Sequence, residues 1–196
     1  LSLVLGLTLG GISGYSGGWA DVVIQRVIEI IRCFPSIPLW MGLSASMPTH
    51  WPALKVYFAI TLILSLVGWT DLARMVRGKL IALREEEFVL AARFIGASDS
   101  RIIFRHLLPS FTSHIIVSVT LAIPGMILAE TALSFLGIGL RPPITSLGVL
   151  LKEAQNVTTV ALYPWLLIPV VFVIIIVLSF NFVGDGLRDA VDPYSR

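Results

Sequence analysis

The sequence has little charge: only 13% of its 196 residues are Asp, Glu, Lys or Arg, whereas 56% are hydrophobic. A water-soluble domain usually carries about 25% charged residues, and the mean hydropathy here is +0.91. Long runs such as FAITLILSLVGW and WLLIPVVFVIIIVLSFNFV offer almost nothing for water to bind. This shortage of charge excludes a soluble globular domain and predicts a chain that crosses a membrane several times.

Several kinds of functional site are missing as well. The single cysteine, Cys33, has no partner for a disulfide or a thiolate metal site. His50, His106 and His114 do not follow metal-ligand spacing, and no GxxxxGK[ST] phosphate-binding motif occurs. We therefore expect no catalytic residue, metal or cofactor on this chain. The net charge of +2 is also too small to favour a nucleic-acid partner.

Five segments are apolar enough to be considered as spans, since a spanning helix needs about 20 mostly apolar residues. They are residues 1–14, 21–47, 53–76, 113–136 and 163–183. Pro35 and Pro38 should kink or break the second segment, and Pro124 should interrupt the fourth. We expect an all-α transmembrane helical bundle forming one domain over residues 1–196. The opening residues lack a Met and a basic stretch, so we expect at least one further N-terminal span before residue 1.

Positive charge is concentrated between the third and fourth segments. Half of the 14 Lys and Arg residues lie there: Arg74, Arg77, Lys79, Arg84, Arg93, Arg101 and Arg105. Basic residues near spans favour the cytoplasmic side. We therefore expect this region and the C-terminal tail GDGLRDAVDPYSR to be cytoplasmic. The loop of residues 137–162 should lie outside and fold as a small cap with one short helix.

The densest charges lie in EEEFVLAARFIGASDSRIIFRHLLP, residues 85–109. Its pattern predicts a helix over residues 81–95, a left-handed cap at Gly96, and a second helix capped by Ser98 or Asp99 and stopped by Pro109. An amphipathic loop in the lipid interface is the alternative. Three adjacent glutamates would be repelled by an anionic leaflet, so docking to a soluble protein is favoured.

The stretch LAARFIGASDSRIIFRHLLP resembles the EAA loop of ABC importer permeases, whose pattern is Glu-Ala-Ala, three residues, Gly, nine residues, Ile-x-Leu-Pro. The spacing fits from Ala91 and Ala92 to Gly96 and Pro109. Leu90 replaces the acid and His106 the isoleucine. These departures resemble the C-type permease of oligopeptide, dipeptide and nickel importers. So do GYSGGWAD, FPSIP, ETALSFLGIGLRPP and GDGLRDAVDP.

The resemblance implies a permease subunit that is not an enzyme. It would pair with a second, similar permease in the cytoplasmic membrane of a bacterium or archaeon, among membrane lipids. Two cytoplasmic subunits would bind ATP and Mg, and an external binding protein would deliver substrate. Residues 81–109 would form the coupling loop, in which the residues implied to couple to the ATPase are Glu87, Phe88, Ala91, Ala92, Ile95, Gly96, Ala97, Ser98, Arg101 and Pro109.

Two groups of charged residues are candidates for the translocation path. Glu130 is an acid inside an apolar segment, where a charge costs about 2.5 to 3.5 kcal/mol, so it should face protein or water. It could gate the path, or it could serve as a structural partner for a buried Arg or for backbone groups. Arg26, Glu29 and Arg32 recur every three residues and could line a vestibule, or could simply pair with one another.

Two other functions fit parts of the sequence. GISGYSGG matches the GxSGxxxG pattern of rhomboid-type intramembrane serine proteases, with Ser13 as nucleophile and His114 as a conceivable base. The match is short, and small residues are common where membrane helices pack. A channel or ion-driven carrier is the other alternative. Neither gives residues 85–109 a specific task.

Overall fold

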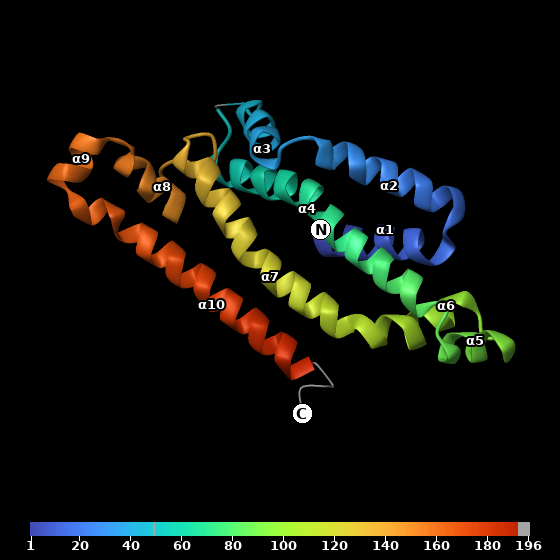
Figure 1. Ribbon diagram of the computed structural model, residues 1–196. Coiled ribbons are helices and arrows are strands. Elements are labelled where there is room, and N and C mark those ends of the chain that lie inside the picture. Colours follow the sequence, from blue (N-terminus) through green and yellow to red (C-terminus); the bar gives the residue numbers. More distant parts are fainter. Residues whose placement is uncertain (49, 192–196) are drawn as a thin grey trace. The chain divides into compact units, whose positions relative to one another are not determined.

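The computed structural model describes residues 1–48 and 50–191, and every regular element among them is a helix (Figure 1). The predicted all-α class is confirmed. The chain divides into two compact units. Unit 1 comprises Leu1–Cys33, Val67–Val119 and the described part of residues 185–196, and unit 2 comprises Phe34–Leu66 and Thr120–Gly184. Each unit has its own hydrophobic core.

Three stretches of the described chain are long and apolar enough to cross a membrane. They are Leu54–Leu83, Asp99–Phe135 and Pro164–Ala190, with 30, 37 and 27 residues. They contain the long helices α4 (Ala53–Leu83), α7 (Leu108–Phe135) and α10 (Ile168–Val191). The first two predicted segments correspond to shorter helices: α1 (Ser2–Ser16), α2 (Gly18–Cys33) and α3 (Ser36–Ala45).

The prolines behave less uniformly than predicted. Pro35 does separate α2 from α3, but Pro38 lies in the first turn of α3, where a missing N–H costs little. The predicted interruption at Pro124 is wrong, because α7 continues through it. In a membrane an ended helix would leave backbone groups unsatisfied, so a spanning helix tolerates proline better than a soluble one.

Unit 1 is built around a helical hairpin that packs on α4. Gly17 and Gly18, with φ of 63° and 56°, make the turn between α1 and α2. Gly6, Gly10 and Gly14 recur every fourth residue of α1, and a Cβ added at any of them would lie within 3 Å of Leu72, Ala73 or Arg77. Small residues at this spacing let two helix backbones approach closely.

Unit 2 contains the predicted external loop. Its core includes Ile60, Leu64 and Leu133, and Leu140 joins them from the loop. The prediction of one short helix is wrong, since two are present: α8 (Leu147–Lys152) and α9 (Val157–Leu162), joined by a 3-10 turn, η2 (Glu153–Gln155). Ser146 caps α8 and Asn156 caps α9 through side-chain oxygens, a role that short polar residues favour.

The helix α10, which follows a 3-10 turn, η3 (Pro164–Leu167), is the least covered of the long helices. Only 6% of its most apolar window is buried, and Phe182 exposes 73% of its surface. Exposed apolar side chains along most of a helix are stable in contact with lipid or another apolar surface. Such a helix agrees with a chain that spans a membrane.

Candidate coupling site

The segment with the densest charge forms two helical arms joined by a glycine turn. The first arm is α5 (Glu87–Phe94), which is shorter than the predicted helix over residues 81–95, because α4 continues to Leu83 and Glu86 is extended. Gly96 has φ of 78°, its N–H donates to the carbonyl of Arg93 at 2.9 Å, and the N–H of Ala97 donates to Ala92 at 3.0 Å. This pair of bonds is a Schellman motif. The predicted glycine cap is confirmed.

The second arm starts where predicted but does not stop at Pro109. Ser98 accepts the N–H of Arg101 and caps α6 (Asp99–Arg101), which continues through a π-helical stretch, η1 (Ile102–Leu107), directly into α7. A proline cannot donate the usual helical bond and clashes with the carbonyl four residues earlier. The wider π turn already breaks that bonding pattern, so Pro109 is accommodated in the first turn of α7.

One face of the two arms is buried in unit 1. Val89 of α5 and Ile102 and Leu107 of η1 are inaccessible to solvent, and they pack with Val76, Leu80 and Phe111. Ala92 belongs to the same core and is only 5% exposed. It was expected on the face that a partner approaches. The structure instead places it against the helices of its own chain, because the helix turns Val89 and Ala92 inward together.

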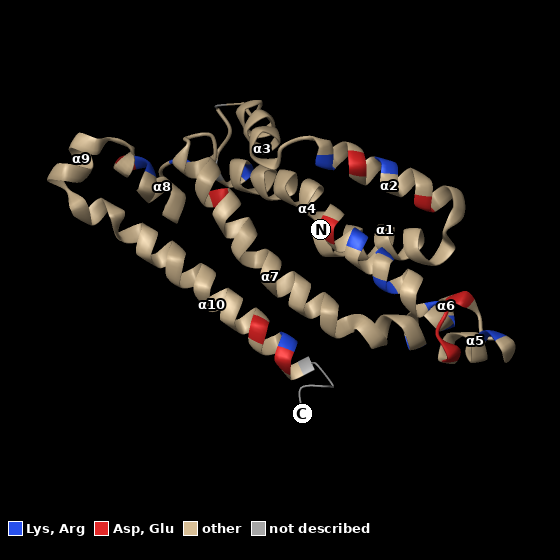
Figure 2. Ribbon diagram, in the orientation of Figure 1, with Lys and Arg blue, Asp and Glu red and all other residues tan. Residues whose placement is uncertain are grey.

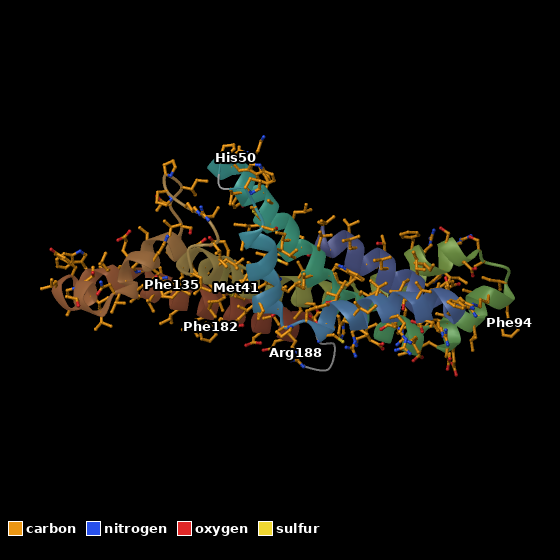
Figure 3. The ribbon with its side chains drawn as sticks, turned by 90° about the horizontal axis from the view of Figure 1, so that it is seen from above. Met41, His50, Phe94, Phe135, Phe182 and Arg188 are labelled. Atoms are coloured by element: carbon orange, nitrogen blue, oxygen red, sulfur yellow. The ribbon has the colours of Figure 1, made fainter. Side chains whose placement is uncertain are left out.

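The opposite face carries an exposed apolar tip, which we define as Phe94 and Ile95. They expose 90% and 85% of their surface, and Figure 3 shows Phe94 pointing away from the ribbon. Phe88 and Ala91 are also exposed, as is Leu90, one of the two departures from the EAA pattern. Phe94 is absent from the predicted contact residues. The signal that could have identified it is an aromatic residue two positions before a glycine cap in a charged region.

Charge surrounds the apolar tip. Glu85, Glu86, Glu87, Arg93 and Arg101 are all exposed, and Figure 2 shows blue and red residues gathered at α5 and α6. The helix α7, by contrast, carries only Glu130 among its Asp, Glu, Lys and Arg positions. A small apolar patch with a polar rim is the usual anatomy of a docking surface between proteins.

Tyr15, at the end of α1, contacts both arms. Its hydroxyl donates to the Asp99 carboxylate at 2.5 Å, and Arg93 Nη2 lies 3.5 Å from the same oxygen. The Arg93 guanidinium carbon also lies 5.6 Å from the centre of the Tyr15 ring, within cation–π range. Burial, followed by the bond to Asp99, raises the pKa of Tyr15, so the phenol stays protonated and donates.

Ser13 and His114, the nucleophile and base of the rhomboid alternative, do not form a hydrogen bond with each other. Ser13 is 1% exposed, donates to Asp21 at 2.5 Å and accepts from Gln25 at 3.0 Å. His114 is exposed, and it is not among these partners of Ser13. The Ser13 hydroxyl therefore supports the α1–α2 hairpin, and no observation favours the rhomboid alternative.

The predicted path residues all take part in ion pairs or hydrogen bonds. Arg26 pairs with Glu29 at 2.7 Å on the exposed face of α2, as spacing predicted, whereas Arg32 pairs with Asp71 of α4. Glu130 accepts hydroxyl protons from Ser134 at 2.6 Å and Ser146 at 3.1 Å. These partners are hydroxyl groups rather than an arginine or the backbone. The role of all four residues in a path stays a prediction.

The strongest charge pair was not predicted. Arg77 donates through Nε and Nη2 to the two carboxylate oxygens of Asp21, both at 2.6 Å. Asp21 also receives the Ser13 hydroxyl. The Arg77 guanidinium holds the pKa of Asp21 below its usual value. The sequence offered no specific signal for this pair, because α2 and α4 each carry several other charged residues that could have been its partners.

Comparison with known proteins gives a consistent result over nearly the whole chain. The family model described as binding-protein-dependent transport system inner membrane component matches residues 6–196. The chain is 38% identical over 197 residues to the oligopeptide transport system permease protein OppC of Bacillus subtilis (strain 168). This alignment covers 100% of the chain and 62% of that relative.

Two further relatives agree. Identity is 40% over 197 residues to OppC of Mycobacterium tuberculosis (strain ATCC 25618 / H37Rv), covering 100% of the chain and 66% of the relative. It is 41% over 193 residues to the dipeptide transport system permease protein DppC of Alkalihalophilus pseudofirmus, covering 98% and 61%. The chain thus spans less than two thirds of these relatives' lengths. With its apolar helices, it is a multi-pass membrane protein, and it belongs to the family of binding-protein-dependent transport system inner membrane components.

Proposed function

We propose that this chain is the permease subunit of a binding-protein-dependent ABC importer that moves di- and oligopeptides across the cytoplasmic membrane of a bacterium or archaeon. The observation that carries the proposal is the exposed apolar tip, Phe94 and Ile95, in a chain of this family. Exposed apolar side chains framed by charge need a partner surface. A peptide substrate is supported by the names of the relatives, oligopeptide and dipeptide permeases.

The partners follow from this assignment. Two ATP-binding subunits hold ATP and Mg, one of them docks at the tip, and a second, homologous permease completes the path. An extracytoplasmic binding protein delivers the peptide, and the cap of residues 137–162 is its proposed contact and gate. The chain performs no chemistry. ATP closes the ATP-binding subunits, the two arms move with them, and the spans open alternately to either side.

The first test replaces exposed apolar tip residues with an acid. Phe94→Asp and Ile95→Asp should abolish co-purification of the ATP-binding subunits and peptide uptake, while membrane insertion stays normal because both side chains are already in solvent. The matched control is Val157→Asp in α9, which is 84% exposed but lies in the predicted external cap. Retention of the ATP-binding subunits by both tip variants would contradict the proposal.

A second test acts on the turn. Gly96→Pro forces φ to about −65°, whereas Gly96 has φ of 78°. The variant should insert and assemble but hydrolyse ATP without transport. Gly78→Ala, a glycine inside α4 with open space around it, is the control. Normal transport by Gly96→Pro would count against the coupling role. Co-purification with an ATP-binding subunit separates an importer from a channel or an ion-driven carrier.

A further inference from the structure

The site that holds the coupling arms in place lies outside the EAA-like segment, in the α1–α2 hairpin. In this hairpin, the Tyr15 hydroxyl donates to Asp99 of the second arm and accepts from Arg93 of the first arm. The two arms also share the hydrophobic core of unit 1, through Val89 of α5 and Ile102 of η1, and the Tyr15 side chain adds a polar contact from α1 to both sides of the glycine turn.

The hairpin that carries Tyr15 is fixed to α4 by close contacts. At Gly10 and Gly14 an added Cβ would meet backbone atoms of Ala73 and Arg77 within 3 Å, so α1 and α4 are in backbone contact. The bidentate pair of Asp21 and Arg77 adds a second connection, with Ser13 bonded to the same carboxylate. Packed interfaces of this kind shift as units rather than deform continuously.

We propose that Tyr15 is a positioning residue which links the two coupling arms to the α1–α2 hairpin, so that a movement of the arms is passed to α4 through the hairpin. The inference rests on the proposed importer function. It adds a polar link to two direct connections: residues 84–86 join α4 to the first arm, and the second arm continues into α7. The link from Tyr15 holds the first and second arms to the same hairpin, so that α4 and α7 receive the movement together, which a rocking motion of the spans requires.

The chemistry of the contact explains why a tyrosine is needed. A phenol is long enough to cross from α1 to Asp99, and it donates a hydrogen bond to a carboxylate, which is among the stronger hydrogen bonds in proteins. Its ring simultaneously offers a face to the Arg93 guanidinium. Phenylalanine at this position would keep the ring contact and lose the two hydrogen bonds of the hydroxyl, to Asp99 and from Arg93.

The test uses the complete importer, reconstituted in liposomes with its ATP-binding subunits, partner permease and binding protein. Tyr15→Phe should assemble normally and hydrolyse ATP, but peptide uptake per ATP should fall about threefold or more. Tyr57→Phe is the matched control, because Tyr57 is a half-exposed tyrosine of α4 in unit 2. It should leave the ratio unchanged.

A double-mutant cycle separates a direct link from general destabilisation. Asp99→Ala should reproduce most of the loss, and Tyr15→Phe combined with Asp99→Ala should be no worse than Tyr15→Phe alone, because Tyr15→Phe already removes the bond to Asp99. Asp99→Asn keeps an acceptor oxygen and should retain part of the coupling. Ser98 remains as the helix cap in every variant.

Three outcomes would overturn the inference: a normal ratio in Tyr15→Phe, additive losses in the double variant, or a parallel fall of hydrolysis and uptake, which indicates a merely structural role. Failure of the proposed function looks different. In that case the unmodified complex shows no peptide uptake driven by ATP, whereas a failure of this inference alone leaves wild-type coupling intact.

Discussion

The two arms of unit 1 and the cap of unit 2 are both small helical insertions between long helices, but different contacts secure them. The arms bury Val89 and Ala92 and present Phe94 and Ile95 to solvent. They are held by charged side chains and by a tyrosine from another helix. A partner can therefore reach the tip without disturbing the core below it.

The cap is held against the end of α7. Ser134 donates to Glu130 and accepts the N–H of Leu140, while Ser146 donates to Glu130 and accepts the N–H of Val149. Gly139 and Gly148 lie so close to the end of α7 that a Cβ would approach its atoms to 2.5 and 2.4 Å. The comparison teaches that the arms are built to be contacted and the cap is built to stay fixed on α7.

The largest expected effect on stability comes from adding a Cβ atom to one glycine in each region. A Cβ at Gly148 would meet the Thr131 carbonyl oxygen, so Gly148→Ala should destabilise the protein by about 1 to 3 kcal/mol. Gly96 has open space and only a left-handed φ, so Gly96→Ala should cost about 1 kcal/mol. Thermal unfolding of the purified complex measures both.

The variant with the smaller loss of stability should show the larger loss of transport. Gly96→Ala should lower uptake per ATP more than Gly148→Ala, measured in variants that still assemble, because only Gly96 lies in the turn that we propose to contact the ATP-binding subunits. If one variant is the more harmful in both assays, the contrast between a contacted region and a fixed one fails.

A comparable effect on stability is expected at the pair that fixes the hairpin. Asp21→Asn leaves Arg77 without its charged partner and should lower stability by about 1 to 3 kcal/mol. The folded pKa of Asp21 is lowered, so the stabilisation is complete above its unfolded pKa of about 3.9 and is lost as the pH falls through the folded value.

The difference in thermal stability between wild type and Asp21→Asn should therefore be constant between pH 8 and pH 5. It should shrink only in stronger acid. Ser13→Ala, which removes one of the three bonds to Asp21, is the milder companion variant. A difference that already changes between pH 8 and pH 6 would contradict the assigned pair.

The smallest effect is expected at Glu130→Gln. Glutamine keeps an acceptor oxygen for the hydroxyls of Ser134 and Ser146, so cap stability should change by less than about 1 kcal/mol. Glu130→Ala removes the acceptor and should cost more. Peptide uptake decides between the roles left open for Glu130, since a loss of uptake in the stable Gln variant would favour a path residue over a structural one.

Local features were predicted well where a single residue sets the backbone. The turn at Gly96, the Ser98 cap and the break at Pro35 were all confirmed, because a left-handed φ, a side-chain acceptor and a missing N–H act within a few residues. The same reasoning failed at Pro109 and Pro124. There the helix continues, since a π turn or the surrounding bundle can accommodate a proline that local rules would exclude.

The sequence by itself determined that this is an all-helical membrane chain and that residues 85–109 form two arms around a glycine, since hydropathy and capping are local properties. Only the tertiary structure decided that Ala92 points into the core, that Phe94 forms the exposed tip, and that Asp21 meets Arg77. It alone brought Tyr15 to Asp99, which is 84 positions away. Such contacts depend on how helices pack, and many packings satisfy the same apolar pattern, so periodicity cannot select among them.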